Sequence, residues 1–436
     1  MNTIKVIKAE HNLLILFHGK SLSLLSIDEG SSVLQKLIES DNGNLSMLYD
    51  EYFQEYLDSI PKSIIGNTEE TLVQDLSTIV LPISSNCNLT CPYCFAKPDG
   101  KNMNFKDFTE KDVDRLLLTI KKKKQAGKLY IAFFGGEPLL RTDIMRYTIE
   151  QAPKVCSNID MAYSVTTNGT LITPKTAKFL KDNDISVLLS IDGYDNEYNY
   201  RKFKNGKSSV DRVLNSIEIL KKEEVPFEIR ATLTSDNPYI YETFLFLEQL
   251  EVPFTLTFAY DSENKTHKDL THYNSLSFLR IKDAFEKLLQ YYRDKIKAKE
   301  PFQNKLIWDY FSILENRTRQ EYSCAAGRTY HTIMADGSMF SCAHLMNEKE
   351  CTLGNISDWP FETEVATLSF MPTKIDEIED CHDCWAQQLC HGGCASQKYS
   401  MGRTAWQPYI KEKCELDKIV YEFIIKLYYE YIRTKK

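Results

Sequence analysis

Short stretches of alternating hydrophobic and polar residues open the chain, and helical patterns follow them. Alternation over a few residues indicates β-strands, and it occurs at Ile4–Lys8, Leu13–His18 and Leu22–Ser26. A later stretch, Leu45–Ile60, has apolar residues at helical spacing and ends before Pro61. We expect residues 1–77 to form a small winged-helix-like module without an active site of its own, because no cluster of reactive side chains occurs in it.

The pattern then changes to a strand followed by a helix, repeated six times up to residue 262. The expected strands are rich in Val, Ile, Phe, Tyr and Thr, as buried parallel strands are: Thr78–Ile83, Leu129–Phe134, Met161–Thr166, Val187–Ile191, Phe227–Leu233 and Phe254–Tyr260. Amphipathic helical patterns lie between them, at Thr109–Lys124, Thr173–Lys181, Ser209–Lys222 and Tyr239–Leu250. Helical crossovers predict a parallel sheet with right-handed connections. We favour a partial, TIM-like (β/α)6 barrel, although periodicity alone also allows an open doubly wound sheet.

The rest of the chain predicts a helical bridge and then an irregular, cysteine-rich region. Residues 263–323 are mainly helical, with a long stretch at Ser275–Lys299. Residues 324–436 contain a hairpin at His331–Met334 and Met339–Cys342, whose turn is the favourable pair Asp336-Gly337. The last expected element is an apolar-striped helix, Leu416–Ile432. The predicted class is α/β, with regions 1–77, 78–262, 263–323 and 324–436.

Composition and charge exclude several classes of protein. The chain has 436 residues and a net charge of -8, so a nucleic-acid partner held by phosphate neutralisation is not expected. No apolar run approaches the roughly 18 residues that span a bilayer, and the N-terminal segment lacks the apolar stretch of a signal peptide. Twelve cysteines are spread through a chain much longer than a small disulfide scaffold. We therefore expect a cytoplasmic protein, away from membranes, whose cysteines bind metal.

Three cysteines form a C-x3-C-x2-C loop directly after the first barrel strand. Thiolates from Cys87, Cys91 and Cys94 can hold a [4Fe–4S] cluster and leave its fourth iron open, whereas four thiolates would close it. An open iron can bind a substrate or cosubstrate. A zinc loop and three buried thiols are the alternatives.

This loop resembles the signature of the radical S-adenosylmethionine (radical SAM) enzymes, and Tyr93 supplies the aromatic residue that the family has before the last cysteine. The resemblance implies that the open iron binds the amino and carboxylate groups of SAM. Reduction of the cluster then cleaves SAM to methionine and a 5′-deoxyadenosyl radical. The resemblance assigns further contacts to SAM by position: Gly135, Gly136 and Glu137 of a GGEP motif, Asn168, Ser190 of an SIDG motif, and Arg201.

The positions of these motifs agree with the expected barrel. Each follows the carboxyl end of a predicted strand, which is the functional end of a β/α barrel. Glu137 is expected near the methionyl ammonium, and Arg201 near the SAM carboxylate, for which a guanidinium fork is suited. The sequence departs from the family in one place, because the residues before Arg201 lack the histidine often found there.

The C-terminal cysteines resemble the seven-cysteine SPASM extension of radical SAM proteins. The resemblance implies two auxiliary [4Fe–4S] clusters, and hence three clusters in all. The first would be held by Cys324, Cys342 and Cys394, and the second by Cys381, Cys384, Cys390 and Cys414. A pair of zinc sites is the alternative, since paired cysteines at such spacings also bind zinc.

Several residues of this region depart from the sulfatase-maturating branch of the family. That branch has another cysteine where Tyr330 stands here, so the first auxiliary cluster is expected to have either an open iron or Cys351 as its fourth ligand. That branch also has an aspartate base where Ala343 stands, followed here by His344, which disfavours formylglycine formation. No general base is assigned. Cys156 is expected to be inert packing.

The N-terminal module resembles, by its order of elements, the precursor-recognition domains of peptide-modifying enzymes. A leader peptide would add a strand to the edge of its small sheet. Together with the SPASM array, this implies a maturase that installs an intramolecular crosslink in a ribosomally made precursor peptide, with a Cys thioether as the expected product. A flavodoxin- or ferredoxin-type protein would supply electrons. A C–C crosslinking cyclase, a sulfatase-maturating oxidase and a non-catalytic iron–sulfur electron carrier remain alternatives.

Overall fold

The computed structural model describes residues 4–8, 13–28, 75–96, 103, 105–194, 199–259, 268–361 and 368–435. The chain begins with an antiparallel meander of three strands: β1 (Ile4–Lys8), β2 (Leu13–His18) and β3 (Ser23–Asp28). The first two have the predicted bounds. The predicted helix Leu45–Ile60 lies outside the described residues.

Six parallel strands follow in chain order across one sheet. They are β4 (Thr78–Ser84), β5 (Gly127–Gly135), β6 (Ile159–Thr167), β7 (Ile185–Ser190), β8 (Phe227–Leu233) and β9 (Phe254–Phe258). Each strand pairs with the next one in the sequence. A doubly wound sheet would reverse its strand order at a switch point, so the partial barrel is the correct alternative.

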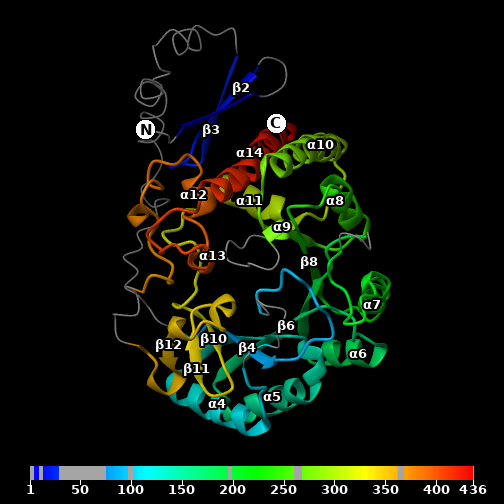
Figure 1. Ribbon diagram of the computed structural model, residues 1–436, viewed down its shortest axis with the longest axis vertical. Coiled ribbons are helices and arrows are strands. Elements are labelled where there is room, and N and C mark those ends of the chain that lie inside the picture. Colours follow the sequence, from blue (N-terminus) through cyan, green and yellow to red (C-terminus); the bar gives the residue numbers. More distant parts are fainter. Residues whose placement is uncertain are drawn as a thin grey trace.

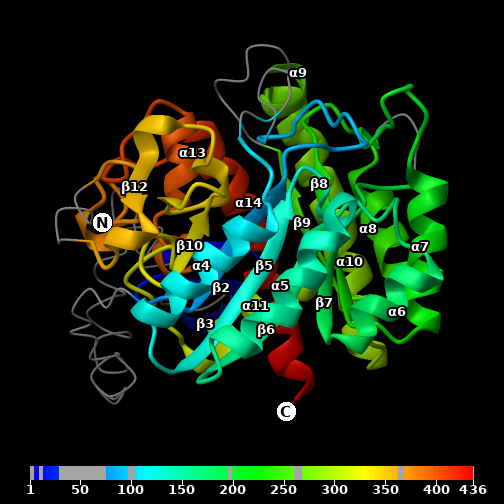
Figure 2. The same ribbon diagram turned by 90° about the horizontal axis from the view of Figure 1, so that it is seen from below.

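Helices cover the outer face of this curved sheet (Figure 2). The crossover helices are α4 (Glu110–Lys123), α5 (Thr142–Val155), α6 (Pro174–Asp182), α7 (Val210–Lys222) and α8 (Ile240–Gln249). Threonines begin two of them, because Thr109 and Thr173 accept hydrogen bonds from the exposed backbone N–H groups of the first turn. Apolar stripes on the helices pack on the outward side chains of the strands, and these form the core of the barrel.

Three strands from the C-terminal region extend the barrel sheet. These are β10 (Tyr330–Ile333), β11 (Ser338–Phe340) and β12 (Thr352–Asn355). The predicted hairpin is present as β10 and β11, and β10 also pairs in parallel with β4. The result is a nine-stranded sheet with the order β12-β11-β10-β4-β5-β6-β7-β8-β9 (Figure 1). This junction was not predicted.

The remaining α-helices follow the last barrel strand, β9, in the sequence. They are α9 (Lys268–Thr271), α10 (Ser275–Ala298), α11 (Lys305–Asn316), α12 (Gln387–Cys390), α13 (Ala395–Ser400) and α14 (Lys411–Thr434). The N-terminal meander lies beside α12 and α14 (Figure 1). Phe17 of β2 packs edge-on against Trp385, and Lys5 of β1 pairs with Glu422 of α14.

No helix in the described ranges is both long and apolar enough to cross a membrane.

Candidate active site

The cysteine loop leaves the end of β4 and rests against the glycines that end β5. A Cβ atom on Gly136 would lie 2.1 Å from the Asn86 carbonyl oxygen, and one on Gly135 would lie 2.4 Å from the Ser84 carbonyl oxygen. The Gly136 N–H donates to the Ser84 carbonyl at 2.7 Å, and the Glu137 N–H donates to that of Asn86 at 2.8 Å. The two glycines therefore let the backbone of the cysteine loop approach β5 closely.

Glu137 is turned into the protein and holds the ends of neighbouring strands together. Its carboxylate is fully buried and accepts hydrogen bonds from the Leu139 N–H at 3.0 Å, the Thr167 hydroxyl at 2.7 Å and the Asn168 N–H at 2.8 Å. Burial raises the pKa of Glu137 to about 7, against the lowering effect of these bonds. The carboxylate thus fixes the backbone beside the predicted SAM site.

Asn168, at the end of β6, contacts the cysteine loop directly. Its amide donates to the Cys87 sulfur at 3.7 Å and to the Asn88 side-chain oxygen at 2.9 Å. Its own side-chain oxygen accepts from the Thr170 N–H and hydroxyl, at 3.0 and 2.7 Å. An N–H group directed at a thiolate ligand is one of the means by which a protein tunes an iron–sulfur cluster.

A buried carboxylate joins Tyr93 and Arg201 at the mouth of the barrel. Asp192 accepts hydrogen bonds from the Arg201 Nε and the Thr232 N–H, both at 2.9 Å, and from the Tyr93 hydroxyl. The Arg201 guanidinium also lies 5.7 Å from the centre of the Tyr93 ring. Asp192 is the third residue of the SIDG motif, and no role was predicted for it from the sequence. Its place directly after a barrel strand could have marked it as a site residue.

The segment that carries Arg201 is held against the cysteine loop. Leu89 and Phe203 form an isolated antiparallel bridge, and the Thr90 N–H donates to the Lys202 carbonyl at 2.8 Å. Ser190, the last residue of β7, is buried and pairs in register with Arg230 of β8. All the predicted SAM contacts thus lie at the carboxyl ends of β4–β7 or on this adjoining segment.

The three thiols of the loop lie close enough to influence one another. Burial raises the pKa of Cys91 to about 12; the Arg201 charge opposes this, and Cys94, Asp192 and Cys87 add to it. A bound metal ion would reverse that rise, because it deprotonates a coordinating thiol. Among the described residues, no three His, Cys, Asp or Glu side chains form a group that could hold a single metal ion.

The C-terminal cysteines fall into two groups in space. Burial raises the pKa of Cys342 to about 12, and the neighbouring thiols of Cys394 and Cys324 add to this rise. The second group is connected in the same way, since Cys381 is influenced by Cys384 and Cys414, and Cys390 by Cys414 and Cys381. These groups have the same members as the two ligand sets that the SPASM resemblance implies, and the ligation itself stays a prediction.

Tyr330, which stands where the sulfatase-maturating branch has a cysteine, and Cys351, the predicted alternative ligand, have different surroundings. Tyr330 lies close enough to Cys342 and Cys324 that both thiols raise its pKa, in addition to the larger effect of burial. Cys351 is fully buried, and its pKa is raised to about 11 by burial and influenced by Tyr399 and Glu350. The structure therefore brings Tyr330, rather than Cys351, to the first group.

Two stacked aromatic rings connect the cysteine loop with the first group of C-terminal cysteines. Phe95 directly follows Cys94, and its ring stacks on that of His344 with centroids 3.8 Å apart. His344 follows Cys342 by two residues, and its side chain is exposed. Arg230 of β8 lies near both His344 and Tyr330. Its positive charge therefore lowers the pKa of each of these side chains. Phe95 and Arg230 were not identified from the sequence.

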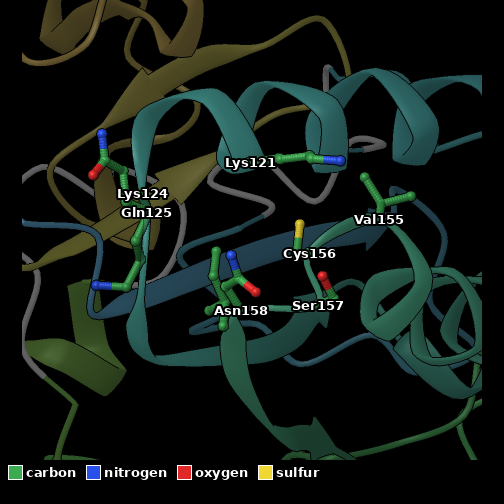
Figure 3. Close-up of a pocket in the computed structure, with 8 residues that line it drawn as sticks. Lys121, Lys124, Gln125, Val155, Cys156, Ser157 and Asn158 are labelled. Atoms are coloured by element: carbon green, nitrogen blue, oxygen red, sulfur yellow. The ribbon is translucent and has the colours of Figure 1, made fainter.

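A separate cavity of about 300 Å³ lies at the opposite end of the barrel, between α4 and the start of β6 (Figure 3). Its lining contains Cys156, whose thiol donates to the Leu117 carbonyl at 3.4 Å. Burial raises the pKa of this thiol, so it is poorly reactive. The lining contains none of the predicted SAM or iron contacts.

The central part of the chain is a radical SAM domain, since residues 81–246 match the family model of the Radical SAM superfamily. The chain is also 29% identical over 339 residues to the cysteine-type anaerobic sulfatase-maturating enzyme of Clostridium perfringens, covering 73% of this chain and 88% of that enzyme. The resemblance to SPASM-type peptide maturases is therefore confirmed.

Solved structures of such enzymes share the fold. Native anSMEcpe with bound AdoMet aligns with a TM-score of 0.66 and 23% identity, over 81% of this chain and 99% of that chain. Streptococcus suis SuiB bound to its precursor peptide SuiA aligns with a TM-score of 0.51 and 18% identity, over 90% of this chain and 95% of that chain. Radical SAM chemistry implies SAM and one [4Fe–4S] cluster as cofactors.

Proposed function

We propose that this protein is a radical SAM maturase that installs an intramolecular crosslink in a ribosomally made precursor peptide, and that the crosslink is a Cys thioether. The observation that carries the proposal is the stacking of Phe95 on His344 at 3.8 Å. It brings the radical-generating cysteine loop and the first C-terminal cysteine group to one place. A peptide bound there would contact both.

We propose three [4Fe–4S] clusters, one at each thiol group described above. The residues proposed to form the SAM site are Tyr93, Gly135, Gly136, Glu137, Asn168, Ser190 and Arg201. The Glu137 carboxylate is buried and would act there by fixing the surrounding backbone. When bound, SAM and its cluster supply a 5′-deoxyadenosyl radical that removes a hydrogen atom from the peptide, and the auxiliary clusters accept the surplus electron. The buried Lys398, which has no carboxylate partner among the described residues, supports this assignment, because its charge requires nearby negative charge.

His344 is the residue we propose to accept the proton of the peptide thiol. Its side chain is exposed, so a bound peptide can reach it. A neutral imidazole has a lone pair that accepts a proton. The stacking on Phe95 fixes the orientation of the ring, and a positioned base is the arrangement that general base catalysis needs.

Arg230 is proposed to hold the peptide at the same place. It is exposed on β8, opposite Ser190 in register, and it lies near both His344 and Tyr330. A guanidinium presents several donors in one plane and suits carboxylates and peptide carbonyls.

The N-terminal meander is proposed to recognise the leader of the peptide. Within the described residues, β1 and β3 are the outer strands of the meander, and an extended peptide can add a strand to such an edge. The complex of SuiB with its precursor peptide, which shares this fold, supports a peptide substrate. We further propose that a flavodoxin- or ferredoxin-type protein reduces the enzyme, and that the enzyme acts in the cytoplasm, where thiols stay reduced.

Co-expression with a short cysteine-containing peptide from a neighbouring gene tests the proposal. A thioether would remove two hydrogens from the peptide and leave one fewer thiol available to an alkylating reagent. The Cys91→Ala variant should leave the peptide unmodified and form no 5′-deoxyadenosine. A product that has lost two hydrogens and keeps every thiol would contradict the thioether and favour a C–C bond.

Sulfatase maturation is a second candidate, because the identity to the cysteine-type enzyme extends over 73% of this chain. Ala343 stands where the sulfatase-maturating branch has its aspartate base. His344, the next residue, could serve as the base instead. Formylglycine formation from a cysteine would exchange its sulfur for oxygen and remove two hydrogens. Mass spectrometry of a co-expressed sulfatase peptide would show that exchange, whereas an unchanged peptide would exclude this candidate.

A further inference from the structure

Lys398 is a buried cation that no carboxylate neutralises within the described part of the chain. Its side chain lies in α13 and is 2% exposed. Its Nζ donates a hydrogen bond to the Ala405 carbonyl oxygen at 2.9 Å. A buried charge without a counter-charge is costly, so the fold must supply negative charge in another form.

Cysteine thiols from both C-terminal groups interact electrostatically with this ammonium group. Burial lowers the pKa of Lys398, and the thiols of Cys381, Cys390, Cys394 and Cys414 raise it. Cys394 belongs to the first group and the other three belong to the second. The Lys398 N–H donates to the Cys394 carbonyl oxygen at 3.0 Å, so the residue is attached beside the first group, and its ammonium group also interacts electrostatically with thiols of the second group.

A charge in this position affects the reduction of a cluster. A cluster gains one negative charge when it accepts one electron, and its potential depends on the local charge, on hydrogen bonds and on exposure to solvent. Inside a protein, the low effective dielectric constant makes such interactions much stronger than in water. A fixed positive charge stabilises the reduced state and so raises the reduction potential.

We propose that Lys398 is a shared counter-charge for the two auxiliary clusters, which raises the reduction potentials of both. The inference rests on the proposed presence of those clusters and not on the identity of the peptide. Lys398 would thereby help the auxiliary clusters to accept the surplus electron of the crosslinking reaction. It contacts neither substrate nor SAM, so it acts by positioning charge.

A second lysine provides a matched control. Lys418 of α14 also lies near two thiols of the second group, Cys384 and Cys414, but it pairs with Glu415 at 3.3 Å, and its side chain is 31% exposed. A paired and solvated charge is screened, so its removal should change the potentials far less.

The test measures reduction potentials in the full chain with the auxiliary clusters alone. Replacing Cys87, Cys91 and Cys94 by Ala removes the SAM-binding cluster. Lys398→Met, Lys398→Gln and Lys418→Met are then introduced separately, and each protein is titrated anaerobically and followed by electron paramagnetic resonance. Iron analysis of each variant shows whether its clusters are retained.

We expect both Lys398 variants to keep their iron and to be reduced less readily. Reduction should be at least tenfold less favourable, which corresponds to about 59 mV for a one-electron couple, while Lys418→Met should change it by less. Unchanged reduction potentials with full iron content would overturn this inference and leave the assignment of the clusters intact. Loss of iron from Lys398→Gln, which keeps a donor for Ala405, would also overturn it, since Lys398 would then serve to retain the clusters. A parent triple variant without iron would overturn the cofactor assignment as well.

Discussion

Asp192 connects three groups of the candidate SAM site that lie far apart in the sequence. Its carboxylate accepts from Tyr93 in the cysteine loop, from Arg201 in the adjoining segment and from the backbone of Thr232 in β8. The Asp192 side chain is 1% exposed and that of Arg201 is 15% exposed, so the ion pair is largely removed from water. The three groups are therefore positioned by one buried charge.

Replacing Asp192 by Asn should destabilise the protein strongly. The variant leaves the Arg201 guanidinium buried without its counter-charge, which costs about 3–5 kcal/mol. Thermal unfolding under anaerobic conditions measures the effect. Asp211→Asn on the exposed start of α7 removes the same charge and should stay within about 0.5 kcal/mol of the parent; equal unfolding temperatures for the two variants would contradict the assignment.

Glu137 should make stability depend on pH. Its folded-state pKa of about 7 lies above the ordinary value of 4.5 because of burial, so the folded protein binds the proton more tightly than the unfolded chain. The stability this group contributes is complete below about pH 4.5 and is lost as the pH rises through about 7, a change on the order of 3 kcal/mol. Glu137→Gln cannot ionise, and its unfolding temperature should fall less over this range. Parallel curves for the two proteins would contradict the prediction.

At the scale of elements, the contact between β5 and the cysteine loop is the tightest constraint on the site. Gly136→Ala would place a methyl group 2.1 Å from the Asn86 carbonyl oxygen, and the loop would have to move. We expect this variant to lose about four iron atoms per chain, the content of one cubane, together with SAM cleavage.

Gly127→Ala, at the other end of β5, is the control for this variant. A Cβ there meets only the end of the Lys124 side chain at 3.9 Å, although its φ of +95° strains the turn. It should keep its full iron content. Normal iron in the Gly136 variant would show that the loop adapts without consequence.

The elements that could be predicted from the sequence are those with local signals. Strand β8 has its predicted bounds, Phe227–Leu233, because apolar and polar residues alternate along its whole length. The ligand groups were implied by the resemblance to the SPASM extension and stay a prediction. The pairing of β10 with β4 could not be predicted, because it joins residues about 250 positions apart and leaves no mark on either strand. The role of Lys398 could not be predicted either, because it depends on burial in the folded protein. Asp192 was missed although its place after a predicted strand was a signal.

At the scale of the whole molecule, the three thiol groups lead to a prediction about metal content. Anaerobically purified protein should contain about twelve iron atoms per chain, four for each cubane, and the Cys87, Cys91 and Cys94 triple alanine variant about eight. Iron analysis with an absorbance spectrum measures this. Zinc in place of iron, or the same iron content in both proteins, would contradict the assignment.

The parallel pairing of β10 with β4 also limits how this enzyme can be recombined with others. A chimaera joined at the end of the helical bridge would replace β10 to β12 with foreign residues. Strand β4 would then lose its partner β10 and become an edge strand of the sheet. Exposed strand edges pair with other chains and promote aggregation. A graft joined after Asn355, where β12 ends, lets the host keep all nine strands of its sheet. Such a graft exchanges the second thiol group and Cys394, and it keeps Cys324 and Cys342 of the host, so the donor must supply a residue that matches Cys394.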